Sequence, residues 1–254
     1  MKRPVVSPLF LVIILVAIGG ALLCTVNSSA AATAGTVLLV IGGWGFALCL
    51  HEFGHAYVAL KGGDFSVRAK GYLTLDPRRY TDPVFSLVLP LLFLLIGGVP
   101  LPGGAVWINH HAIRSRKMDC LVSLAGPLSN LAVGIVLSEI IGAVWPDFLS
   151  GLGSPLAMAL SYLAELQFVA FIINILPVPG LDGWGAIEPW LSAEAKRFGQ
   201  QVRPWAPLVL FAVLIGLPGI GQVLYQGADA IFGAFHGTPD LAHLGQSTFL
   251  FWRH

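Results

Sequence analysis

The chain has 254 residues, of which 56% are hydrophobic and only 11% are charged, and its formal net charge is +1. Soluble domains carry about 25% charged residues, so this composition and a mean hydropathy of +0.80 exclude an ordinary soluble domain. They predict a protein embedded in a lipid bilayer, and the near-neutral charge gives no sign of a nucleic-acid partner.

The N-terminus carries Lys2 and Arg3 and continues into an apolar run over residues 9–26. This run is either a signal peptide that is cleaved or a first span that is retained. Because the apolar character continues almost unbroken into the next segment, we favour a retained N-terminal span.

Further apolar segments follow, and most are near the roughly 20 residues that a helix needs to cross a bilayer. They cover Thr36–Leu60, Val84–Val99, Leu121–Val144, Leu156–Leu176 and Pro207–Leu224. We therefore expect an all-α polytopic membrane protein with about five or six transmembrane helices. The tail, residues 225–254, ends in aromatic residues that are typical of an interfacial anchor.

Positive charge indicates which loops face the cytoplasm, and Lys2 and Arg3 place the N-terminus there. Two later loops are also basic: one holds Lys61, Arg68, Lys70, Arg78 and Arg79, and the other holds Arg114, Arg116 and Lys117. Two cytoplasmic loops are separated by an even number of crossings, yet one apolar segment, Val84–Val99, lies between them. We favour a re-entrant or short β element there; the alternative is that one loop departs from the charge rule.

The residues His51-Glu52-Phe53-Gly54-His55 lie near the cytoplasmic end of the second apolar segment. On a helix, positions i and i+4 share a face, so His51 and His55 can point two imidazoles at one metal ion. Glu52 lies beside them, where it can take a proton from water. Ionisable residues are costly in membrane spans, so we favour a metal site over two structural histidines.

A catalytic zinc site needs a third protein ligand and an open position for water. By the charge rule, Leu121–Val144 runs outward and Leu156–Leu176 returns inward, which brings Asp182 to the membrane side of the HEFGH motif. An aspartate in a Pro/Gly loop is a common turn residue. Its position opposite the motif nevertheless predicts that Asp182 is the third ligand.

Other polar residues compete for roles at this site. Asn174 lies at the end of an apolar span, where its amide could bond the backbone or donate to an oxyanion. Gly126 and Asn130 share one helix face and are predicted to pack against the HEFGH helix. Rival ligands are less favoured because they lie in surface loops or in the tail: His110, His111, His236, His243 and His254.

These elements together resemble the site-2 protease family of intramembrane zinc metalloproteases. The resemblance spans about residues 40–190 and rests on HEFGH at 51–55, AGP-xx-N at 125–130 and N-x-x-P-x-x-x-L-D-G at 174–183. It implies that His51, His55 and Asp182 bind one Zn²⁺ per chain. It also implies that Glu52 is the general base and that Asn174 aids the intermediate.

The family cleaves transmembrane segments of other proteins, often after a first cut elsewhere. The resemblance thus implies membrane-protein substrates in a lipid bilayer, in a bacterial cell membrane, with the active site toward the cytoplasm. Residues 61–120 are too short and apolar for the PDZ domain of many members, and the tail is too short for a regulatory domain. We expect one protease domain over 1–254, with its catalytic core at about 36–190, a C-terminal span at 207–224 and a tail at 225–254.

Two other functions use the same residues. A membrane carrier for metal ions would also need histidines and an aspartate, although it would have no need of a base such as Glu52. A non-catalytic scaffold is the other alternative, and the presence of Glu52, both histidines and Asp182 argues against it. The metal itself is inferred from the ligand types, and other divalent ions could bind.

Overall fold

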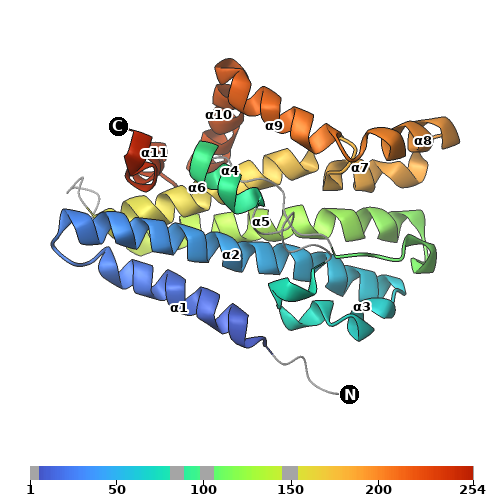
Figure 1. The fold of residues 1–254 in the computed structure, drawn as a ribbon, viewed down its shortest axis with the longest axis horizontal. Coiled ribbons are helices and arrows are strands. Elements are labelled where there is room, and N and C mark those ends of the chain that lie inside the picture. The colour runs from blue at the N-terminus through green and yellow to red at the C-terminus, as the bar shows by residue number, and fades with distance from the viewer. Residues whose placement is uncertain (1–5, 81–88, 98–105, 145–153, 254) are drawn as a thin grey trace.

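The computed structural model describes residues 6–80, 89–97, 106–144 and 154–253, and these residues form helices and turns without a strand. Four helices lie along the long axis of the molecule (Figure 1): α1 (Pro8–Leu23), α2 (Ser29–Gly62), α5 (Arg116–Val144) and α6 (Pro155–Ile175). The side chains of Ser28 and Ser154 cap the first turns of α2 and α6 by accepting backbone N–H groups. The expected all-α class is confirmed.

Three of these helices, α2, α5 and α6, are long and apolar enough to cross a membrane. Helices α9 (Ala206–Gly216) and α10 (Pro218–Ala234) form a bent pair. If this pair counts as one span, the number of candidate membrane spans rises to four. Helix α1 is apolar but has only 16 residues. The described part of the chain is therefore a multi-pass membrane protein.

The last predicted span, Pro207–Leu224, differs from a straight helix. Its two halves meet at an angle of 91°. Leu217 lies at the break and has extended backbone angles, φ −117° and ψ 90°. The residue that precedes a proline is driven out of the α region, which accounts for the break at this point.

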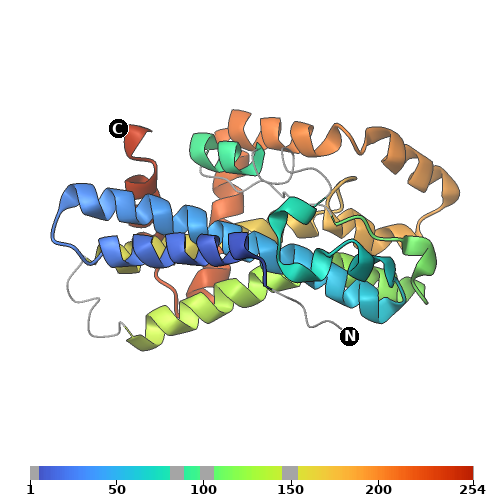
Figure 2. The same ribbon diagram turned by 60° about the horizontal axis from the view of Figure 1, so that its bottom comes forward.

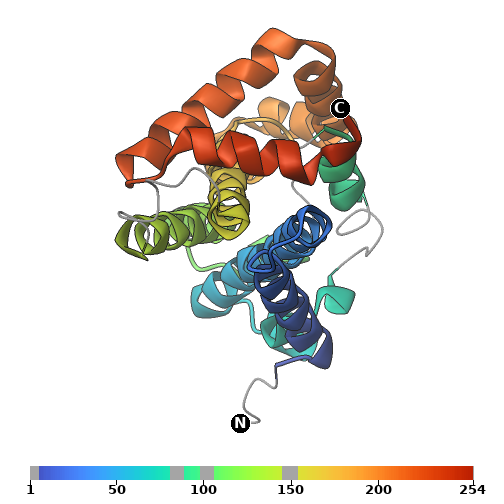
Figure 3. The same cartoon turned by 90° about the vertical axis from the view of Figure 1, so that its left-hand side faces the viewer.

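The remaining helices surround the α2–α5–α6 core. Figure 3 shows α1 on one side of this core and α9, α10 and α11 (Pro239–Phe249) on the other. Helix α4 (Leu89–Gly97) has nine residues, too few to cross a bilayer. The rest of the predicted re-entrant or β element, 84–88 and 98–99, lies outside the described residues.

The C-terminal aromatic residues only partly resemble an interfacial anchor. Phe249 and Leu250 are buried in a core cluster with Tyr162 and Trp44, whereas Phe251 and Trp252 are exposed. Only the last part of the aromatic tail is therefore exposed enough to act as the expected anchor. The end of α11 is held against α6 by the Tyr162–Phe249 ring contact.

Short elements gather at one end of the molecule. Figure 2 shows α7 (Asp182–Ile187) and α8 (Ala193–Val202) at the same end as the C-terminal part of α2 and the start of α5. The other short elements at this end are α3 (Ser66–Ala69), η1 (Tyr72–Thr74), η2 (Pro77–Arg79), η4 (His110–Ala112) and η6 (Glu188–Trp190), whereas η7 (Phe251–Arg253) lies beside the C-terminus at the other end. The end that carries α7 and α8 holds the HEFGH motif and Asp182, which the charge rule had placed on one membrane side.

Small residues allow α1 and α2 to lie backbone to backbone. A Cβ atom at Gly20 would overlap the backbone of Leu39, and one at Gly35 would lie 2.7 Å from the amide nitrogen of Cys24. Helices in membranes associate through such close packing because lipid offers no hydrophobic driving force between them. Close packing of small residues therefore helps to hold α1 against α2, together with the contact between Cys24 Sγ and Thr36 Oγ1 at 3.9 Å.

We predict that Gly20→Ala lowers stability by about 1–3 kcal/mol, because the new methyl group forces α1 away from α2. Thermal unfolding of the purified chain in detergent micelles measures this change. Gly19→Ala is the matched control, because nothing lies within 4 Å of a Cβ at Gly19. Equal effects of the two substitutions would contradict the packing described for α1.

Candidate metal centre

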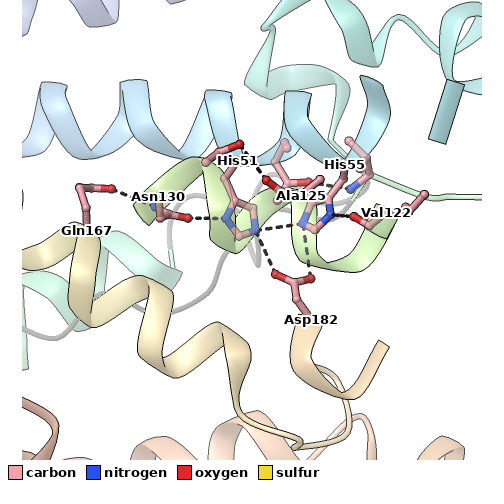
Figure 4. A network of polar contacts seen from close by, with 10 residues as sticks. His51, His55, Val122, Ala125, Asn130, Gln167 and Asp182 are labelled. Carbon is pink, nitrogen blue, oxygen red and sulfur yellow. Dashed lines mark hydrogen bonds and ion pairs between the residues drawn. The ribbon is translucent and has the colours of Figure 1, made fainter. Parts of the chain in front are cut away.

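Three side chains from two segments converge on one point, as Figure 4 shows. His51 and His55 lie one turn apart on α2, and their Nε2 atoms are 3.1 Å apart. The carboxylate of Asp182 faces both: Oδ2 lies 3.2 Å from His51 Nε2, and Oδ1 lies 3.4 Å from His55 Nε2. The structure thus brings together the three residues that the sequence predicts as metal ligands.

A tight turn after α6 directs Asp182 back toward α2. Helix α6 ends at Ile175, just before Pro177, and Gly180 has a φ of +100°, which favours glycine. A Cβ at Gly183 would overlap the carbonyl group of Ile175. The prolines and glycines around Asp182 therefore allow α7 to begin directly beside the end of α6.

The ring orientation of His55 is set by a backbone carbonyl of α5. Its Nδ1 lies 2.7 Å from the carbonyl oxygen of Val122, which can only accept a hydrogen bond. Nδ1 must therefore carry the proton, and in a neutral imidazole Nε2 is left as an acceptor. Pro127 lies inside α5 and has no N–H, so the helix lacks the bond to the carbonyl of Ser123, the residue after Val122.

His51 is oriented by a chain of amide side chains that crosses from α2 through α5 to α6 (Figure 4). Gln167 donates through Nε2 to the carbonyl of Leu163 at 3.3 Å, so its Oε1 is the atom that accepts from Asn130 Nδ2 at 2.9 Å. The Oδ1 atom of Asn130 then accepts from His51 Nδ1. The carbonyl of Leu163 thereby fixes the direction of every bond, and His51 Nε2 is an acceptor too.

Three acceptor groups therefore face one another with no hydrogen between them. Asp182 adds a carboxylate, the form that an aspartate side chain takes near neutral pH. Ligand atoms about 2.0–2.1 Å from a tetrahedral zinc ion lie about 3.3 Å apart, close to the separations found here. The donor set and its spacing fit a zinc ion.

Helix α5 must approach these ligands closely, and glycine makes that possible. A Cβ at Gly126 would overlap the Nε2 atoms of both histidines. A Cβ at Gly54, on α2, would lie 2.7 Å from the hydroxyl of Ser129 and 2.9 Å from the carbonyl oxygen of Ala125. The predicted packing of the Gly126–Asn130 face on the HEFGH helix is confirmed.

Glu52 and Asn174 share a cavity with the three candidate ligands. Both are buried and, together with the three ligand residues, line a cavity of about 210 Å³. One carboxylate oxygen of Glu52, Oε2, accepts the backbone N–H of Val106 at 3.0 Å. This contact holds the carboxylate at the cavity wall, next to the point where the ligands converge.

The rival histidines are not among the three converging side chains, although His110 lines the same cavity. His110 pairs with Asp119 at 2.6 Å, and this hydrogen bond raises the pKa of His110. His236 pairs with Glu139 at the surface, and His243 lies near two other carboxyl groups. His111 is in the surface turn η4, and His254 lies outside the described residues.

The sequence did not indicate the residues that support the ligands. The tertiary fold alone brings the carbonyl of Val122 to His55 and the amide of Val106 to Glu52. It also brings Gln167 to Asn130, which in turn contacts His51. A glutamine within an apolar span was the one available signal, because a polar residue there needs a partner. Asn130 was expected to pack against α2, but its contact with a ligand was not foreseen.

Comparisons with known proteins agree with this geometry. Rip2 of Mycolicibacterium smegmatis, which is named as a zinc metalloprotease, is 41% identical over 97% of this chain and 94% of its own length. Rip2 of Mycobacterium tuberculosis is 40% identical over the same shares. YwhC of Bacillus subtilis, which is also named as a zinc metalloprotease, is 32% identical over 73% of this chain and 85% of its own length. The chain belongs to the site-2 protease family.

Neither the family models nor the solved structures contain a match. The relationship to this site-2 protease family therefore rests on sequence identity along almost the entire chain. The alignments with the two Rip2 proteins cover 97% of this chain, which is far more than the residues 40–190 that carry the motifs.

We predict that Asn130→Ala weakens zinc binding by about 10- to 100-fold, because His51 loses the partner that fixes its ring and tautomer. Competition against a zinc-binding dye measures this affinity. Ser129→Ala is the matched control, since its hydroxyl bonds only to Ala125 within the same helix. A zinc affinity in Asn130→Ala equal to that of the control would show that the amide chain does not support the site.

Proposed function

We propose that this chain is an intramembrane zinc metalloprotease that hydrolyses peptide bonds within or near the transmembrane segments of other proteins. The observation that carries the proposal is one shared cavity. His51, His55 and Asp182 line it together with the candidate base Glu52 and the amide of Asn174. A site of this kind contains metal ligands, a proton acceptor and a hydrogen-bond donor, which are the components of metal-assisted hydrolysis.

Each residue of the chain has a separate task in this proposal. A zinc ion held by His51, His55 and Asp182 would supply Lewis acidity to water and to a peptide carbonyl. Glu52 takes the proton from the attacking water and passes it to the leaving amine. The side-chain N–H of Asn174 donates to the oxygen that gains negative charge in the transition state.

Water and substrate must both reach a site carried by membrane-spanning helices. The cavity extends from the ligands to Gln200 and Arg203, which are exposed at the end of α8. This path supports access of water from the side of the molecule that carries the basic loops, which we propose is the cytoplasmic side of the cell membrane. A helical substrate must unwind before cleavage, because its carbonyls are occupied by internal hydrogen bonds.

The same cavity favours a protease over a carrier. A carrier has no need of a general base, whereas Glu52 lines the same cavity as the candidate ligands and is held at its wall by the backbone N–H of Val106. We propose a single protease domain over 1–254, with its catalytic core at about 36–190, that acts in regulated intramembrane proteolysis. The scaffold alternative is disfavoured because every group that the chemistry requires is present.

We predict that Glu52→Gln lowers cleavage of a single-span membrane substrate by at least about 10²- to 10⁴-fold, because the amide cannot accept the proton of water. Zinc content should stay at the wild-type value. Glu188→Gln is the control, because it changes another cavity carboxyl group that has no proposed role. Substantial cleavage by Glu52→Gln would contradict the assignment of Glu52 as the general base.

Asn174→Ala is expected to lower kcat by about 10²- to 10³-fold while KM and zinc content change little, because the lost donor acts on the transition state. Steady-state cleavage kinetics separate the two constants. Gln200→Ala removes another amide from the cavity wall and serves as the control. A rise in KM at constant kcat would instead assign Asn174 to substrate binding.

A further inference from the structure

A second group of potential metal ligands lies between α6, α10 and α11, the region where Figure 3 shows the C-terminal helices against the core. Glu165 of α6, Asp229 of α10 and His243 of α11 each present a ligand atom, and these atoms lie within 4.8 Å of one another. None of the three lines the cavity of the HEFGH motif. The group is therefore separate from the proposed catalytic site.

Glu165 is the most unusual member of this group. Its side chain is 0% exposed, and neither of its carboxyl oxygens meets a partner with good hydrogen-bond geometry, although the carboxyl group of Asp229 lies near enough to share a proton with it. The Oδ1 atom of Asp229 is buried without a hydrogen-bond partner as well. A buried carboxylate is costly unless a cation or a hydrogen bond compensates it. Among the described residues, His243 is the one basic side chain paired with either group.

The separations within the group suit a shared ion better than direct hydrogen bonds. His243 Nε2 lies 3.4 Å from Asp229 Oδ2 and 3.6 Å from Glu165 Oε1. Hydrogen bonds between nitrogen and oxygen are about 2.7–3.2 Å long. Two ligand atoms on one tetrahedral metal ion, each about 2.0–2.2 Å from it, are separated by about 3.3–3.6 Å. The nitrogen–oxygen separations in the trio at the HEFGH motif are slightly shorter, 3.2 and 3.4 Å.

We propose that Glu165, Asp229 and His243 bind a second divalent transition-metal cation, for which Zn²⁺ is the probe. One dication balances the two carboxylates while the imidazole stays neutral, and imidazole with carboxylates suits zinc better than magnesium or calcium. The side chain of His243 is 49% exposed, which gives the ion a way in. The ion ties α10 and α11 to α6, the helix that also carries Gln167 and Asn174.

The test is the number of zinc ions bound per chain. The full chain is purified in detergent, stripped with a chelator, dialysed against buffered free zinc and analysed by elemental mass spectrometry. We expect two zinc ions in wild type and in Glu52→Gln, and one in either His243→Ala or Glu165→Gln. Because His243 is half exposed, its replacement leaves a folded chain even if Glu165→Gln does not.

Two further variants keep this result separate from the proposed catalytic site. His55→Ala should bind one zinc, which is lost when His243→Ala is added, whereas His236→Ala should still bind two. His236 is the matched control because it pairs with Glu139 alone at the surface. One zinc per chain in wild type, or a second zinc that persists in both His243→Ala and Glu165→Gln, would overturn the proposal.

Discussion

The proposed active site depends on one electrostatic constraint: three acceptor groups face one another without a hydrogen between them. The Nε2 atoms of His51 and His55 are acceptors because each Nδ1 is already committed as a donor. The carboxylate of Asp182 completes the set at 3.2 and 3.4 Å. Such an arrangement is repulsive by itself and becomes favourable around a cation. Much of the surrounding structure serves to hold these groups in place.

This constraint links the site to the packing of the membrane helices. The direction of the amide chain is set at the carbonyl of Leu163 on α6, and it reaches His51 through Gln167 and Asn130. Gly126 lets α5 lie directly against both histidines. Because three helices contribute to the orientation of one ring, a change in how α5 or α6 packs on α2 alters the metal ligands. Metal affinity and helix packing are thus expected to change together.

The sequence predicted the parts of the site that follow from local geometry. The i, i+4 spacing placed His51 and His55 on one face, and the charge rule put Asp182 on the same side of the membrane. The contacts of Gln167 and Val106 with the site join residues far apart in the chain, so no local pattern shows them. Helices α2, α5 and α6 were recognised from their apolar runs, whereas the 91° break before Pro218 was not. The proposed second site depends on how α10 and α11 meet α6, which hydropathy does not specify.

The most direct test of this account is diffraction from crystals of the zinc-loaded chain, recorded on both sides of the zinc absorption edge. The account predicts an anomalous peak about 2.0–2.2 Å from the Nε2 atoms of His51 and His55 and from an oxygen of Asp182. It also predicts that Asn130 still contacts Nδ1 of His51 in that structure. A loaded crystal without a peak at this position, or with a peak there that is not within bonding distance of Asp182, would contradict the account.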